Sequence, residues 1–111
     1  MIQPNNQSLW EAILVYHPDK PGIDLPFSKR LAIENGWTRR FALRAIEEYK
    51  RFVFLALTAG TQVTPSEEID QVWHLHMVYT RAYWDDFCGQ VLNKPFHHAP
   101  ESVWCSYHCC F

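Results

Sequence analysis

The stretch "TPSEEIDQVWHLHMVYTRAYWDDFC", from Thr64 to Cys88, decides the expected fold class of this chain. Thr64 can cap a helix, Pro65 suits the first helical position, and Glu67 lies three residues after the cap. Successive residues of a helix rotate by about 100°, which gathers the apolar and aromatic side chains on one broad face. That face comprises Ile69, Val72, Trp73, His76, Tyr79, Tyr83, Trp84 and Phe87. The pattern therefore predicts one amphipathic helix across the whole stretch.

The two histidines of this helix are two residues apart, so a regular helix directs them about 200° apart. His76 lies on the aromatic face, where it is either a structural histidine with an internal hydrogen bond or a ligand or general base that lines a pocket. His74 lies on the opposite face, one turn after Asp70, a spacing at which a carboxylate can orient a metal-bound imidazole. The same two residues could equally form a solvated pair without a ligand. The opposite face comprises Glu67, Asp70, His74, Arg81, Asp85 and Cys88.

Two segments near the N-terminus also have the residue pattern of helices. In "SLWEAILVY", Ser8 and Glu11 form a capping-box signature, and the following "HPDKPG" ends the helix. In "PFSKRLAIENG", Pro26 suits the first turn and Gly36 suits the C-terminal cap. The side chains expected to face inward in this second helix are Phe27, Leu31 and Ile33.

The segment from Thr38 to about Leu57 has the strongest helical periodicity. Its inward face is expected to contain Phe41, Ala45, Tyr49, Phe52 and Ala56. No segment has the alternating pattern of a strand. We therefore expect an all-α fold, a small bundle of about four helices within residues 1–100, followed by an irregular Cys-rich segment, 101–111.

The charge balance and the apolar runs exclude several classes of protein. Ten Lys and Arg residues face twelve Asp and Glu residues, so no broad positive field attracts nucleic acid. The longest apolar run, 52–59, is far shorter than the roughly 20 residues that span a bilayer. The N-terminal residues have neither the basic nor the hydrophobic part of a signal peptide. We expect a cytoplasmic chain, in which Cys105, Cys109 and Cys110 are free thiols or soft-metal ligands.

A metal site is the first functional hypothesis. Zinc needs three or four protein ligands, and the two histidines of the helix could share one ion only if the helix were distorted. The loop histidines could fold back against the helix and supply the missing ligands. The predicted ligands of a divalent transition metal such as zinc are Asp70, His74, His76, His97 and His98.

A module that binds proteins is the alternative hypothesis. In this case the histidines are structural, and exposed aromatic side chains contact another protein or a second copy of the chain. An enzyme is a third possibility, in the form of a hydrolytic metal centre. No phosphate-binding loop, nucleophile elbow or kinase signature occurs in the sequence, so whether the chain is an enzyme stays open.

The segments "EEYKRFVFLAL", "TPSEEIDQVWHLHMVYTRAYWDDFC" and "HHAP" together resemble the glycine-rich domain-containing protein-like family. The resemblance covers roughly residues 26–100 and rests on Asp70, Trp73, His74, His76, Tyr79, Tyr83, Cys88 and His97. It implies that the acidic residue and the histidines belong to one shared feature, but the family has no defined activity. Its members continue into a Gly- and Tyr-bearing helical stretch, whereas this chain continues as "ESVWCSYHCCF". The resemblance therefore implies a C-terminal part that is either truncated or diverged.

Overall fold

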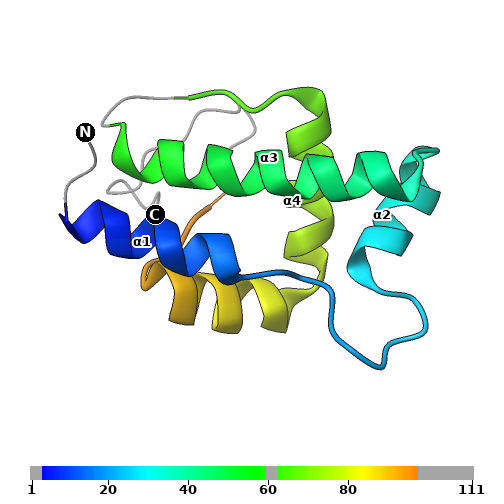
Figure 1. Cartoon of the computed structure of the whole chain (residues 1–111), viewed down its shortest axis with the longest axis horizontal. Helices are drawn as coiled ribbons and strands as arrows, with labels where there is room; N and C mark the ends of the chain where they lie inside the picture. The colour runs from blue at the N-terminus through cyan, green and yellow to red at the C-terminus, as the bar shows by residue number, and fades with distance from the viewer. Residues whose placement is uncertain (1–3, 60–62, 98–111) are drawn as a thin grey trace.

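The computed structural model of the chain describes residues 4–59 and 63–97. These residues form five helices and no strand, which confirms the expected all-α fold. The helices are α1 (Pro4–Val15), α2 (Phe27–Asn35), α3 (Arg39–Thr58), α4 (Glu67–Val78) and η1 (Arg81–Leu92). Figure 1 shows α3 as the long central helix, which packs against α1, α2 and α4, while η1 packs against α1 and α4. The predicted boundary at residue 100 and the segment 101–111 lie outside the described residues.

Gly36 caps the end of α2 and Thr38 caps the start of α3, and the cap at Gly36 is the one that the sequence predicts. Gly36 ends α2 in the left-handed conformation, with φ of 69°, which a glycine adopts without steric cost. The Thr38 side chain accepts a hydrogen bond from the Phe41 amide at 3.0 Å and so caps α3. The core face of α3 contains the predicted Ala45, Tyr49, Phe52 and Ala56. Phe41 differs from the prediction because its ring packs on Trp37, with centroids 4.8 Å apart, and stays 41% exposed.

The first two helices also depart from their predicted details. α1 begins at Pro4, four residues before the predicted cap at Ser8, because a proline at the first helical position needs no amide partner. Glu11 accepts a hydrogen bond from the Gln7 side chain at 3.0 Å, an i,i+4 contact within the helix. In α2, Phe27 and Leu31 are buried as predicted, whereas Ile33 is exposed.

The expected single helix from Thr64 to Cys88 is wrong, because the chain forms two helices that meet at Tyr79. This residue leaves the helical region, with φ of −85° and ψ of 74°. Its ring packs against Phe27 at 5.5 Å, and its hydroxyl accepts a hydrogen bond from Arg30 at 3.3 Å. The contacts with α2 accompany a change of direction that Figure 1 shows between α4 and η1.

The caps and faces of this region differ accordingly. Ser66, and not Thr64, caps α4, because its side chain accepts a hydrogen bond from the Ile69 amide at 3.2 Å. η1 is a π-helix, whose i→i+5 hydrogen bonds shift the faces predicted from 100° per residue. Trp84 is therefore 36% exposed instead of buried, and Cys88 is 3% exposed instead of solvated.

A buried tyrosine ties the segment after η1 to the core. Tyr83 accepts a hydrogen bond from the Trp73 indole N–H at 2.8 Å and donates its own to the Phe96 carbonyl. The rings of Trp73 and Phe96 stack in parallel, with centroids 4.6 Å apart and planes 10° apart. The segment that leads to His97 is thus anchored to α4 and η1.

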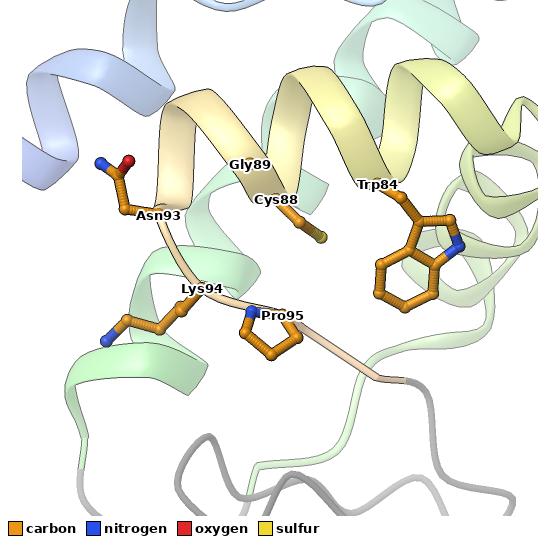
Figure 2. Close-up of a pocket in the computed structure, with 6 residues that line it drawn as sticks. All are labelled: Trp84, Cys88, Gly89, Asn93, Lys94 and Pro95. Atoms are coloured by element: carbon orange, nitrogen blue, oxygen red, sulfur yellow. The ribbon is translucent and has the colours of Figure 1, made fainter.

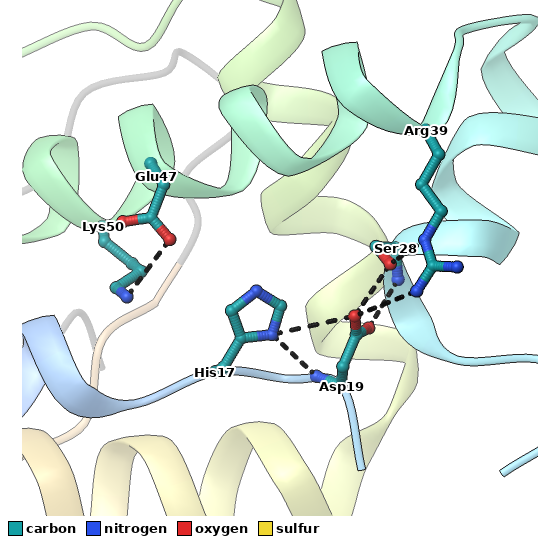
Figure 3. A network of polar contacts seen from close by, with 6 residues as sticks. All are labelled: His17, Asp19, Ser28, Arg39, Glu47 and Lys50. Carbon is teal, nitrogen blue, oxygen red and sulfur yellow. Dashed lines mark hydrogen bonds and ion pairs between the residues drawn. The ribbon is translucent and has the colours of Figure 1, made fainter. Parts of the chain in front are cut away.

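Polar contacts of Lys50 and Asp19 fix the loop between α1 and α2, and Figure 3 shows those of Asp19 with Ser28 and Arg39. The Lys50 ammonium, although buried, donates to the Leu14 carbonyl at 2.9 Å near the end of α1. The Asp19 carboxylate accepts hydrogen bonds from the Ser28 amide at 2.7 Å and the Ser28 hydroxyl at 2.8 Å, at the start of α2. Arg39 donates to the same hydroxyl at 3.0 Å. These contacts hold both ends of the loop, which begins at Tyr16.

Candidate functional site

His76 lies at the centre of the bundle and is fully buried. Its Nε2 lies 2.8 Å from the Tyr16 hydroxyl, at the end of α1, and its Nδ1 lies 2.8 Å from the Tyr49 hydroxyl, in α3. The rings of Tyr83 and Phe87, both from η1, have centroids 5.0 Å from that of His76. One imidazole therefore contacts side chains from three other segments of the chain.

Burial determines the protonation of this cluster. Burial, with a smaller contribution from the charge of Lys20, lowers the pKa of His76 to about 3. Burial also raises the pKa of the Tyr16 and Tyr49 hydroxyls above the ordinary tyrosine value. All three groups are neutral at physiological pH. Since a neutral imidazole has one donor and one acceptor nitrogen, one tyrosine accepts from His76 and the other donates to it.

The geometry assigns His76 a structural role. Both ring nitrogens are engaged, so a metal ion on His76 would have to displace one of the two tyrosines. The geometry fits the structural alternative that the sequence offered for His76, and its place among the metal ligands stays a prediction.

His74 and Asp70 lie on the other face of α4, as predicted. The His74 Nε2 lies 3.4 Å from the Asp70 Oδ2, and the His74 side chain is 57% exposed. The i,i+4 spacing therefore brings the imidazole and the carboxylate together at the surface. His74 could ligate a metal ion while Asp70 orients its imidazole, or both residues could ligate the ion.

Only one of the two remaining predicted ligands lies among the described residues. His97 packs beside Trp84, with ring centroids 5.2 Å apart, and His98 lies outside the described residues. Among residues 4–59 and 63–97, no group of three or more His, Cys, Asp or Glu side chains could hold a metal ion. The metal assignment of Asp70, His74, His97 and His98 therefore stays a prediction.

Cys88 lines a depression of about 400 Å³ between η1 and the segment that follows it. Figure 2 shows its sulfur and the Trp84 indole directed toward Pro95. Burial raises the pKa of the Cys88 thiol to about 11, so the thiol is protonated at neutral pH and is a weak nucleophile. Cys105, Cys109 and Cys110 lie outside the described residues.

Sequence reasoning missed a groove between α3 and the start of α4. This α3–α4 groove has a volume of about 390 Å³ and is lined by Phe41, Arg44, Ala45, Glu48, Ser66, Glu68 and Ile69. Its apolar lining comes from side chains that two helices contribute, so no single helix pattern reveals it. The available signal was the sequence "RRFALR", in which three arginines surround Phe41.

A second depression continues the groove toward the start of α3. This arginine recess has a volume of about 560 Å³ and is lined by Thr38, Arg40, Phe41 and Arg44. Because Phe41 and Arg44 line both depressions, the two form one continuous surface.

Comparison with known proteins identifies a family. The model of a family described as UCP032817-like matches residues 27–107, most of the length of the chain. No curated protein and no solved structure matches significantly. The match overturns the resemblance stated from the histidine-bearing segments, because the glycine-rich domain-containing protein-like family is a different family. It also extends past residue 100, where the helical domain was expected to end.

Within residues 4–59 and 63–97, no helix combines the length and the hydrophobicity that a membrane span requires.

The buried imidazole predicts a pH dependence of stability. Below about pH 6.5 the unfolded chain protonates this histidine, whereas the folded chain resists protonation down to a pKa of about 3. Stability is therefore fully present above pH 6.5 and falls as the pH decreases, by about 1.4 kcal/mol per pH unit from this group. Urea unfolding between about pH 7.5 and about pH 5 measures the free energy of unfolding. This free energy should fall more steeply with decreasing pH in the wild type than in His76→Gln, by the slope given above.

His74→Gln, which replaces an exposed histidine of the same helix, is the matched control, because it leaves the buried His76 and its contribution to the slope in place. Equal slopes in the wild type and in His76→Gln would contradict the assignment of a neutral, buried His76.

Proposed function

Since the chain belongs to the UCP032817-like family, an uncharacterised family whose name assigns no chemistry, we propose that it is a protein-interaction module. The module binds a segment of another polypeptide on its helical surface, and His76 is part of its scaffold. The observation that carries the proposal is the α3–α4 groove. A concave surface with an apolar lining and a polar rim is the usual form of a peptide-binding site.

The structure of the groove supports this proposal in two ways. Phe41 exposes 41% of its surface although it stands beside a well-packed core, and exposed aromatic side chains are frequent energetic centres of interfaces. The floor beneath it is formed by Ala45, which is buried in α3 and cannot move without disturbing the core. A partner segment would therefore meet a surface that is already formed, which lowers the entropic cost of binding.

Selection from a random peptide display library, with the chain immobilised, tests this proposal. We expect enriched peptides that bind the free chain in calorimetry with micromolar affinity, equivalent to about 8 kcal/mol. Ile69→Asp should weaken their binding by about tenfold or more, because it places a charge in the apolar groove. Ile33→Asp, at an exposed site on α2, is the matched control and should bind as the wild type does. No enriched peptide, or equal loss in both variants, would contradict a groove-binding module.

A second candidate function is binding of a divalent transition metal. It is favoured by the 3.4 Å contact of His74 with Asp70 on the exposed face of α4. These residues would supply two ligands, and His97 and His98 are the predicted others. Zinc has the tetrahedral preference and the affinity for imidazole and carboxylate that suit such a set.

Zinc titration of untagged protein, followed by calorimetry, separates this candidate from the first. Metal binding predicts near-stoichiometric zinc in the wild type and a loss of at least about tenfold in affinity in His74→Ala. His17→Ala removes a histidine that contacts Asp19 and should leave zinc binding unchanged. A wild type that takes up no zinc would exclude the candidate.

A further inference from the structure

We infer that the α3–α4 groove, with its arginine recess, selects an acidic segment of a partner protein that carries a large apolar anchor. The inference rests on the proposed function and adds to it the chemistry of the partner. It follows from the charges around the groove, from the placement of two arginines in α3 and from the apolar residues that line the groove.

Arg40 and Arg44, at the groove, differ from the three other arginines of α2 and α3, which pair with carboxylates. Arg30, Arg39 and Arg51 pair with Glu34, Asp19 and Glu48 at 2.7, 3.7 and 2.8 Å. Among the residues that the structure describes, no carboxylate lies within 4 Å of Arg40 or Arg44. Both line the arginine recess, so their guanidinium groups stand at the edge of an open depression.

The position of this pair in α3 is unfavourable for the free protein. Arg40 and Arg44 are four residues apart, where like charges on a helix repel each other. Arg40 also lies in the first turn of α3, which has no acidic residue to balance the positive end of the helix dipole. A partner with carboxylates would relieve both effects, because each guanidinium can form two parallel hydrogen bonds to a carboxylate.

The opposite end of the groove gives the partner a direction. Glu48 is engaged by Arg51 at 2.8 Å, and Glu68 lies in the first turn of α4, where a negative charge is favourable. These acidic residues are already compensated, and they would repel carboxylates of the partner. The acidic part of the segment therefore belongs over the arginine recess, with its apolar part toward Ile69.

Phe41 joins the two halves of the site. Its ring lies beside the Trp37 ring, with centroids 4.8 Å apart, and it lines both depressions. An apolar side chain of the partner can thus pack on Phe41 and Ala45 while a neighbouring carboxylate reaches Arg44. Electrostatic contacts of this kind raise the association rate and the specificity of an interface.

Fluorescence anisotropy with two labelled synthetic peptides tests the inference. Both peptides carry the same Leu and Trp anchors, flanked by Asp and Glu in the first peptide and by Lys in the second. The acidic peptide should bind the wild type about tenfold or more tightly than the basic one, a preference of about 1.4 kcal/mol. Its affinity should fall as NaCl is added, because salt screens the exposed arginines.

Charge-reversed variants locate the effect. Arg40→Glu/Arg44→Glu should invert the preference, and the milder Arg40→Gln/Arg44→Gln should abolish it. Lys29→Glu/Arg81→Glu makes the same change of net charge at exposed sites on α2 and η1, and should keep the wild-type preference. Circular dichroism of each variant confirms that the helices are intact.

Equal affinity for the two peptides would overturn the inference, as would an equal loss in the control variant. Dimerisation of the wild type that Arg40→Gln/Arg44→Gln abolishes would also overturn it, because a second copy would then occupy the groove. Each of these results would leave the proposed function intact if peptides selected from the library still bound the wild type and lost affinity in Ile69→Asp. If the library yields no binder, the interaction function itself fails.

Discussion

The structure depends on the hydrogen bonds of one neutral imidazole. His76 lies between the Tyr16 and Tyr49 hydroxyls, each 2.8 Å from a ring nitrogen. These residues belong to the end of α1, to α3 and to α4, so the bridge joins three segments that are far apart in the sequence. An unpaired polar group in such a core costs about 1 to 3 kcal/mol. The three groups therefore stabilise one arrangement of the helices and penalise others.

Several unusual features of the fold surround this bridge. The loop that begins with Tyr16 is held by the contact of Asp19 with Ser28. The break at Tyr79 redirects the chain so that η1 returns Phe87 to the His76 ring, with centroids 5.0 Å apart. The same division of the chain leaves the outer side of α3 uncovered near Phe41, where the groove lies. The scaffold and the candidate interaction surface are thus two consequences of one helix arrangement.

Local sequence signals predicted the parts of the structure that depend on local interactions. The cap at Gly36 follows from the residue type, because glycine adopts the left-handed conformation without steric cost, and the opposite environments of His74 and His76 follow from helical rotation. The break at Tyr79 depends on contacts with α2, so no pattern within the stretch itself could reveal it. The family was misassigned because the resemblance rested on histidines and aromatic residues, and several of these form the core of this fold.

The candidate site was only partly predictable for the same reason. Asp70 and His74 are one helical turn apart, so their contact follows from spacing alone. The groove requires Phe41 of α3 and Ile69 of α4 to lie together, and this is a property of tertiary packing. His76, one of the predicted metal ligands, has both ring nitrogens hydrogen-bonded to tyrosines. The exposed groups on which the two proposed functions rest are the arginines of α3 and the Asp70–His74 pair.

Long-range ¹H–¹⁵N correlation spectra of the histidine side chains test the central claim most directly. The spectra are recorded between about pH 8 and about pH 5, the range in which an unperturbed imidazole gains its charge. One imidazole, identified by its absence in His76→Gln, should keep the shifts of a single neutral tautomer throughout. Titration of that imidazole near pH 6.5 would contradict the account, because a buried histidine held between two tyrosines cannot accept a proton at that pH without disrupting the core.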